Sequence, residues 1–385
     1  MASKKAADML EILQGVESSA GNKKKAKLSF WNDKEMGSIV SFGIPSVDTA
    51  SNIGGHKRGD IIEIFGPESS GKSYTAYKMM AQYQAQGLNV ALLDVEHAFW
   101  GPWVAKAGVN LAKVVYGQDF ESGEQTMLYA QKMAESGAFG IIVIDSIAAL
   151  LPQSEANSSL DENARVGAHA AMMSRCLRTL MGVMSRTETT LVCINQTRVK
   201  IGVMFGNPED TPGGKALKFY AGMRIGLQFI GKEMAKVDGV DKPVGIRTKV
   251  KFIKNKVGQP FGEDEMVIYH VEGINTPMVQ LVNLAIRLRV VPGRKAFDED
   301  NSDKKLAEKK TYVWKDSDGD PQDTSCTTAS DLADWFEAND LVPTVVDMVI
   351  AKAKIKGVEV PPEVLLLKAS DTSKTPAEVT EDPKA

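Results

Sequence analysis

A glycine-rich segment that follows a short apolar run constrains this sequence more than any other feature. The run DIIEIF at 60–65 predicts a buried strand, and a helix is expected from about Tyr74 to just before Gly87. Between them lies GPESSGKS at 66–73, which fits G-x-x-x-x-G-K-[ST] in the strand–turn–helix setting that this pattern requires. The glycines allow successive backbone N–H groups and the helix N-terminus to face a phosphate. The segment predicts a nucleoside triphosphate site formed by Gly66, Pro67, Glu68, Ser69, Ser70, Gly71, Lys72 and Ser73.

Two side chains of this segment and one distant carboxylate predict the metal chemistry of the site. Lys72 is expected to reach the β- and γ-phosphates, and the hydroxyl of Ser73 is expected to bind Mg²⁺. Asp145 ends the apolar run IIVID, where a buried strand would not carry a charge without a reason. Taken alone, such an aspartate is more often a cap or turn residue, but beside a phosphate loop it predicts a second magnesium ligand. ATP and Mg²⁺ are the expected cofactors.

Polar residues also end two other strands of the predicted sheet. Glu96 ends VALLDVE, and Gln196 follows TLVCIN. Ligands of a doubly wound sheet lie outside the carboxyl ends of its strands, so both side chains should face the nucleotide. Glu96 can polarise the attacking water, with a surface cap as the structural alternative, and Gln196 can contact the γ-phosphate. His97 is as readily a structural histidine as a functional one.

The order of apolar runs and helical patterns predicts the fold. From residue 60 to 195, strand and helix patterns alternate, which is typical of an α/β fold with a mainly parallel, doubly wound sheet. Alternating patterns at 218–230 and 246–257 predict antiparallel strands at one edge. A hairpin in TYVWKDSDGD and two helices after it predict a small C-terminal α/β unit. The expected division is an N-terminal oligomerisation helix and linker at 1–36, an ATPase core at 37–290, a C-terminal domain at 291–368 and a disordered tail at 369–385.

Composition limits the partners of this core. With 46 basic and 49 acidic residues the net charge is −3, so a nucleic-acid surface would have to come from local clusters of Lys and Arg. No apolar run is long enough for a signal peptide or a membrane span. The three cysteines lie far apart and predict neither a disulfide nor a metal site. We therefore expect a cytoplasmic protein without a membrane partner.

The segment after TLVCINQ is too long and too rich in glycine for a simple turn. It reads TRVKIGVMFGNPEDTPGGKALKFY and combines Arg198, Lys200 and Lys215 with the aromatic ring of Phe205. Cations that contact phosphates, together with an aromatic stacking face, are typical of proteins that bind single-stranded nucleic acid. A solvated flexible loop is the alternative.

Six strings of the sequence, in this order and spacing, resemble the bacterial RecA family over about residues 37–275: GPESSGKS, LLDVEHA, IIVIDSIAALLP, NQTRVKIGVMFGNPE, GGKALKFY and KNKVGQPF. The region TSCTTASDLADWF is instead similar to phage recombinases of the UvsX kind, which suggests a phage-encoded member acting in the host cytoplasm. The resemblance implies a DNA-dependent ATPase that forms filaments on single-stranded DNA and exchanges strands with a homologous duplex in recombination and repair. It also implies a single-strand-binding protein and loader proteins as candidate partners.

The same resemblance assigns roles to individual residues. Glu96 resembles the glutamate that activates water, and Trp103 stands where the family has a tyrosine that stacks on adenine. Gln196 matches a γ-phosphate sensor that opens the second DNA loop, here Thr197 to Gly213, which is the predicted DNA loop below. Lys254 and Lys256 match a pair that reaches the γ-phosphate of a neighbouring protomer. The residues implied at DNA are Arg165, Arg178, Arg198, Lys200, Phe205, Gly213 and Gly214, and those implied at the protomer interface are Lys218 and Phe219.

The chain departs from the family pattern in the first DNA loop, near 157–167, and beside the adenine site. Ala171 stands where the family usually has a basic residue, and Arg165 lies nearby as a substitute. Trp100 replaces a usual acidic residue. These departures concern the first-loop contacts and the nucleotide affinity, not the reaction.

Two other functions share parts of this pattern. A ring-forming helicase has the same sheet and phosphate loop, but it is not expected to carry KIGVMFGNPE together with KNK. A non-catalytic mediator would bind ATP and DNA without exchanging strands. The presence of Glu96, Asp145 and Gln196 argues against the mediator.

Overall fold

The computed structural model describes residues 38–157, 167–199, 209–237, 240–270, 277–291, 313–315, 321–324, 326, 329–356, 360, 364 and 367. The expected N-terminal helix, most of the first DNA loop and the expected tail lie outside these residues.

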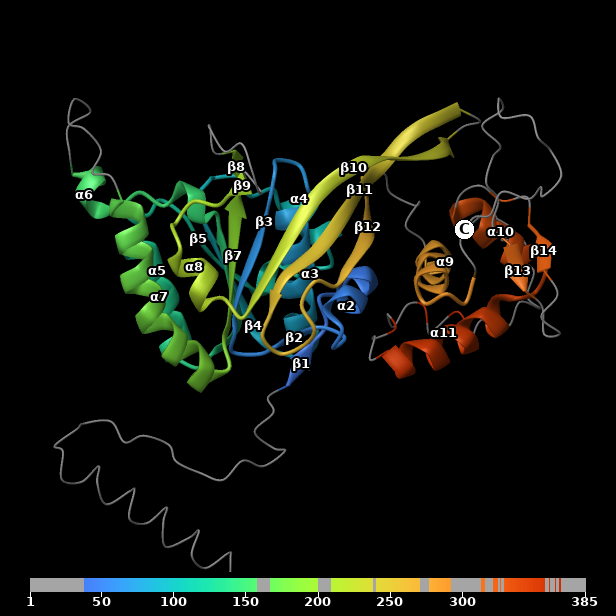
Figure 1. Ribbon diagram of the computed structural model, residues 1–385, viewed down its shortest axis with the longest axis horizontal. Coiled ribbons are helices and arrows are strands. Elements are labelled where there is room, and N and C mark those ends of the chain that lie inside the picture. Colours follow the sequence, from blue (N-terminus) through green and yellow to red (C-terminus); the bar gives the residue numbers. More distant parts are fainter. Residues whose placement is uncertain are drawn as a thin grey trace, which may run out of the picture. The chain divides into compact units, whose positions relative to one another are not determined.

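An eight-stranded sheet forms the centre of the fold, with the strand order β12-β11-β10-β3-β7-β6-β4-β5 (Figure 1). From β10 to β5 every neighbouring pair is parallel, whereas β10 with β11 and β11 with β12 are antiparallel. The strands are β3 (Ile61–Gly66), β4 (Asn89–Asp94), β5 (Val114–Gly117), β6 (Phe139–Asp145), β7 (Thr190–Gln196), β10 (Met223–Val237), β11 (Val240–Asn255) and β12 (Glu263–Tyr269). The prediction of a mainly parallel α/β fold with antiparallel edge strands is confirmed.

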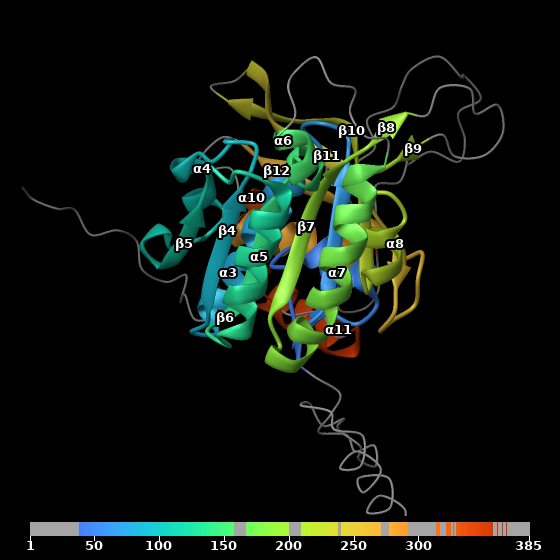
Figure 2. The ribbon, with the colours of Figure 1, turned by 90° about the vertical axis from the view of Figure 1, so that its left-hand side faces the viewer.

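Helices cover both faces of the sheet because alternate strand residues point to opposite sides. Ile62 and Ile64 pack with α2, α3 and α4, whereas Ile61 packs with α5, α7 and α8, which lie in front of the sheet in Figure 2. The helices around the sheet are α2 (Pro45–Ser51), α3 (Lys72–Ala85), α4 (Gly101–Lys106), α5 (Gly123–Glu135), α6 (Gln153–Ala156), α7 (Ala168–Thr187) and α8 (Ala216–Tyr220). Two short ladders accompany them: β1 (Ile39–Val40) with β2 (His56–Lys57), and β8 (Arg198–Val199) with β9 (Glu209–Asp210).

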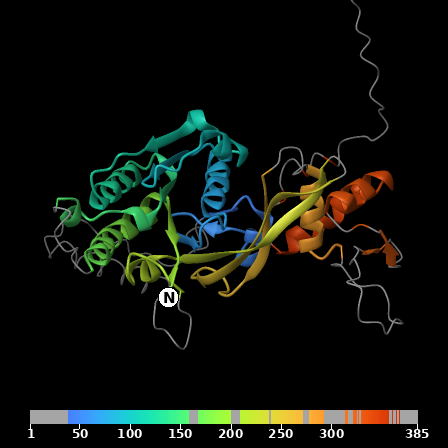
Figure 3. The same ribbon diagram turned by 90° about the horizontal axis from the view of Figure 1, so that it is seen from above.

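A second hydrophobic cluster is built from the C-terminal elements. The helices α9 (Pro277–Arg287), α10 (Ala329–Ala338) and α11 (Val342–Lys356) pack together, as their grouping in orange and red in Figure 3 shows. Trp314 on β13 (Val313–Lys315) joins this cluster, and β13 pairs with β14 (Pro321–Asp323) in the antiparallel hairpin that the sequence predicted. The sequence analysis did not identify α9, and the predicted domain boundaries stay predictions.

Cys176, Cys193 and Cys326 are all free thiols. Among the described residues, no helix combines the length and the apolar character that a membrane crossing needs.

Candidate nucleotide and DNA site

The phosphate loop connects β3 to α3 at the carboxyl end of the strand. Its backbone turns at Ser69 (φ 56°) and Gly71 (φ 89°), and α3 begins at Lys72. A side chain at Gly71 would be strained in this left-handed conformation, and its Cβ would meet Cδ1 of Ile268. The loop is closed by Ser70 Oγ, which donates to the carbonyl of Pro67 at 2.8 Å. This local structure supplies the N–H groups of a helix N-terminus to an anion.

Ser73 and Asp145 are brought together from α3 and β6. The Ser73 hydroxyl donates to Oδ2 of Asp145 at 2.7 Å. Asp145 is buried, and this burial raises the pKa of its carboxyl group to about 6. A hydroxyl and a carboxylate are the hard oxygen ligands that Mg²⁺ prefers, and a cation there would offset the cost of burying the charge. The two predicted magnesium ligands therefore fit the metal.

Lys72, the first residue of α3, is influenced by the carboxylates of Asp145 and Glu96. Its ammonium group donates to the carbonyl of Pro67 at 2.7 Å. Burial lowers its pKa, although the charges of Asp145 and Glu96 act in the opposite direction.

Glu96 joins three strand ends through its side chain and backbone. Its Oε1 accepts hydrogen bonds from Oγ of Ser146 and from Nε2 of Gln196, the latter at 3.1 Å. The N–H of Glu96 also donates to the carbonyl of Asp145 at 3.2 Å. The exposed carboxylate is thus held in place through Oε1, and among the described residues Oε2 accepts no hydrogen bond. The sequence analysis missed Ser146, although its position directly after the magnesium ligand was a usable signal.

Asp94 was also missed, and it shapes the turn that carries Glu96. Its buried carboxylate accepts from the N–H groups of Ala98 at 3.2 Å and Phe99 at 3.0 Å, and from the hydroxyl of Tyr116 at 2.9 Å. His97 lies on this turn with φ 55°, and its exposed ring is 3.9 Å from Oδ1 of Asp119.

A pocket of about 460 Å³ extends from the phosphate loop to Trp103 and His270. The rings of Trp103 and His270 are stacked, with centroids 5.4 Å apart and an interplanar angle of 18°. Lys106 contacts both residues. Its ammonium group lies 5.6 Å from the centroid of the Trp103 ring and donates to the backbone carbonyl of His270 at 2.6 Å. The stacked rings of Trp103 and His270 form a flat, partly apolar wall of this pocket, which fits the predicted contact of Trp103 with a base. His270 lines this pocket and was not identified from the sequence. Trp100, which stands where the family usually has an acidic residue, is 68% exposed.

The predicted DNA residues are described only in part. Arg165, Lys200 and Phe205 lie outside the described residues, and of Arg198 only the backbone in β8 is described. Arg178 is exposed on α7, where Nε donates to the hydroxyl of Tyr220 on α8 at 3.4 Å.

Three further predicted residues lie between β9 and the end of α8. Gly213 and Gly214 turn the chain after β9 with φ 93° and 67°. Phe219 on α8 is 68% exposed, and its place at a protomer interface stays a prediction.

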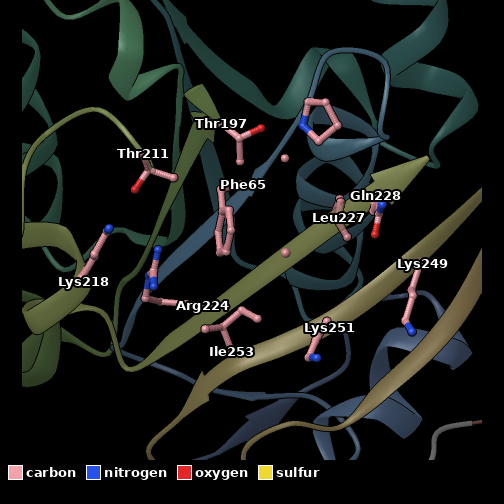
Figure 4. Close-up of a pocket in the computed structure, with 13 residues that line it drawn as sticks. Phe65, Thr197, Thr211, Lys218, Arg224, Leu227, Gln228, Lys249, Lys251 and Ile253 are labelled. Carbon is pink, nitrogen blue, oxygen red and sulfur yellow. The ribbon is translucent and has the colours of Figure 1, made fainter. Parts of the chain in front are cut away.

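A second pocket, of about 350 Å³, lies beside the two ends of the predicted DNA loop (Figure 4). Thr197 and Thr211 line it together with Phe65, and the predicted interface residue Lys218 lies at one side. Three other cations of the pocket were missed by the sequence analysis: Arg224, Lys249 and Lys251. The ammonium groups of Lys249 and Lys251 lie 3.2 and 3.9 Å from Oε2 of Glu263, and the alternation KVK in β11 was their signal.

Lys254 and Lys256 are not brought to the phosphate loop of their own chain. Lys254 is opposite Arg224 in the β10–β11 register, and Arg224 is opposite Glu63, near the beginning of β3. The ammonium of Lys254 donates to the carbonyls of Lys218 at 2.7 Å and Phe219 at 3.0 Å. The phosphate loop starts at the other end of β3.

Comparisons with known proteins identify a family and relatives of this chain. A family model described as the RecA N-terminal domain matches residues 7–275. Protein RecA of Gluconobacter oxydans is 42% identical over 253 residues, which cover 66% of this chain and 71% of the relative. Protein RecA of Chlorobium limicola is 43% identical over 252 residues, covering 66% and 70%. A solved structure titled as the RadB recombinase matches with a TM-score of 0.45 and 20% identity, over 60% of this chain and 96% of that one.

Proposed function

The chain belongs to the RecA family, and on this premise we propose that it is an ATP-dependent DNA recombinase. It forms a filament on single-stranded DNA and catalyses homologous pairing and strand exchange with a duplex. The observation that carries the proposal is the contact of Gln196 with Glu96. It joins the carboxylate that would activate water to the strand that leads directly into the predicted DNA loop, so hydrolysis and DNA binding meet at one hydrogen bond.

ATP hydrolysis follows from the groups at the carboxyl edge of the sheet. The phosphate-loop amides and Lys72 hold the β- and γ-phosphates. Ser73 and Asp145 would hold Mg²⁺, which would supply positive charge to the phosphate oxygens. Glu96 accepts a proton from water as the water oxygen bonds to the γ-phosphorus and the bond to the bridging oxygen breaks, leaving ADP and phosphate. Gln196 contacts the γ-phosphate and loses that partner on its release.

A neighbouring protomer completes the site. Within one chain, Lys254 and Lys256 lie at the opposite end of β3 from the phosphate loop, which supports a role at the nucleotide of another copy. In a filament they offset the charge that develops on the transferred phosphoryl group. Assembly is therefore a condition of hydrolysis, with Lys218 and Phe219 at the interface.

DNA is held by its backbone and by stacking. Arg178, Arg198 and Lys200 contact phosphates, Arg165 substitutes for the missing basic residue of the first loop, and Phe205 stacks on or wedges between bases. Watson–Crick pairing supplies the sequence specificity, so the protein needs no contacts to base edges. A single-strand-binding protein and loader proteins are the proposed accessory partners, and the cytoplasm is the proposed location.

The test is a strand-exchange assay on the full chain, combined with electron microscopy of complexes formed with ATP and single-stranded DNA. Filaments and exchanged products are expected, both dependent on ATP. Rings that unwind a duplex would indicate a helicase instead. Binding of ATP and DNA without exchanged products would indicate a mediator.

A further inference from the structure

A buried carboxylate lies in the central strand β3, three residues before Gly66, where the phosphate loop begins. Glu63 has no exposed surface, and its neighbours along the strand are Ile62 and Ile64. Burying an unpaired carboxylate in such a sheet is costly, so its partners are informative. Arg224, opposite Glu63 in the β3–β10 register, donates from Nε to Glu63 Oε2 and lies over the Phe65 ring, 4.7 Å from its centroid. The charge of Glu63 is thereby balanced.

The other oxygen of Glu63 is bound by Asn195, which also has no exposed surface. The Nδ2 group of Asn195 donates to Glu63 Oε1 at 3.0 Å and to the carbonyl of Pro212 at 3.0 Å. An amide NH₂ carries two hydrogens, so both bonds form at once. Oδ1 of Asn195 accepts from the N–H of Gln196 at 3.0 Å. Each polar group of this side chain therefore has a specific partner.

These contacts lie at the base of the predicted DNA loop. The loop leaves β7 at Thr197, whose N–H donates to the carbonyl of Gly66, the first residue of the phosphate loop, at 3.3 Å. Its described ends pair as β8 and β9, with Arg198 opposite Asp210. Two residues after β9, Pro212 is bound by Asn195. The outgoing end is thus tied to the phosphate loop, and the returning end to the residue beside Gln196.

We propose that Asn195, supported by Glu63 and Arg224, is a positioning residue that couples the loop base to Gln196, so that DNA binding stimulates hydrolysis. The inference rests on the proposed function. A displacement of Pro212 acts on Asn195, and Asn195 acts on the backbone of Gln196, whose side chain contacts Glu96. A buried ion pair that served stability alone would need no contact with the loop or with the sensor residue.

The experiment compares Asn195→Ala with Tyr83→Phe. The control removes a buried hydrogen bond at the other end of β7, where the Tyr83 hydroxyl lies 2.6 Å from Oγ1 of Thr190. For each protein, ATP turnover is measured without DNA and with single-stranded DNA, together with KM for ATP and the thermal midpoint. In Asn195→Ala the stimulation by DNA should fall about tenfold or more, while the DNA-free rate and KM stay near wild type. Tyr83→Phe should lower the thermal midpoint and keep the stimulation.

The outcomes separate the proposals. If Asn195→Ala lowers the thermal midpoint but keeps the wild-type stimulation, Asn195 is structural and the coupling is wrong. Should Asn195→Ala fail to fold, Asn195→Ser, which keeps a small polar group too short to span both acceptors, is measured by the same criteria. A wild-type protein whose ATPase ignores single-stranded DNA would overturn the recombinase function and the coupling together.

Discussion

The two ends of the central strand β3 differ in how much of a catalytic site each contains. At the carboxyl end, one chain brings together the phosphate loop, Ser73 with Asp145 at 2.7 Å, and Glu96 with Gln196 at 3.1 Å. At the amino end lie Lys254 and Lys256, with Lys254 bound to carbonyls of α8. Ile61 and Gly66 are five residue steps apart along β3, which is about 16 Å.

Under the proposed function, this difference makes hydrolysis depend on assembly. One chain holds the groups proposed to bind ATP and orient water, whereas Lys254 and Lys256 lie at the other end of β3. In the proposed filament, these lysines of one chain would lie beside the carboxyl end of the next, which is a heterologous contact.

Replacement of Lys72 by Ala should have the largest effect, because the carboxyl end loses its one cation expected on the β- and γ-phosphates. DNA-stimulated ATP turnover is expected to fall by about a thousandfold or more. Turnover is measured by phosphate release, and unfolding by circular dichroism checks that the fold is kept. Unchanged turnover would remove the phosphate loop from the site.

The second prediction tests the amino end by mixing. Lys254→Ala combined with Lys256→Ala, and Lys72→Ala, should each be nearly inactive alone. In an equal mixture about a quarter of the interfaces would pair an intact phosphate loop with intact lysines, since each interface joins unlike surfaces. A corresponding part of the turnover should return. If mixed filaments are seen by microscopy and no activity returns, the lysines do not act between chains.

The third prediction separates binding from chemistry at the carboxyl end. Glu96→Gln keeps an oxygen that can accept from Ser146 and Gln196, but it cannot take a proton from water. Turnover is expected to fall about a hundredfold, with ATP and DNA affinities retained and filaments that last longer. Both affinities are measured by fluorescence titration. Filaments that fail to form would mean that Glu96 is a structural residue.

Sequence reasoning predicted what depends on local pattern. The phosphate loop, the alternation of strands and helices along the chain, and the antiparallel edge of the sheet follow from short runs of residues. The spacing within these runs indicates local structure. The contacts of Asn195 with Glu63 and Pro212 could not be predicted in this way, because they join residues 132 and 17 positions apart. Helix α9 was missed because it lies between the edge strands and the charged segment, where no glycine-rich motif marks its start.

The fourth prediction has the smallest effect and concerns Asp145. Its folded pKa of about 6 lies above the ordinary value of 3.8, because burial disfavours the charged form. Between these values the folded chain binds the proton more tightly than the unfolded chain, so the free energy of unfolding decreases as pH rises from about 4 to about 6. Asp145→Asn removes the ionised form but retains an acceptor for Ser73. The ligand-free variant should therefore be more stable than wild type near pH 7, by about 1–2 kcal/mol, and the difference should vanish toward pH 4. Urea unfolding across this range measures it. Since Mg²⁺ with ATP would favour the ionised carboxylate, the same ligands should stabilise wild type more than the variant. A difference that does not depend on pH would show that burial of the charge is not its cause.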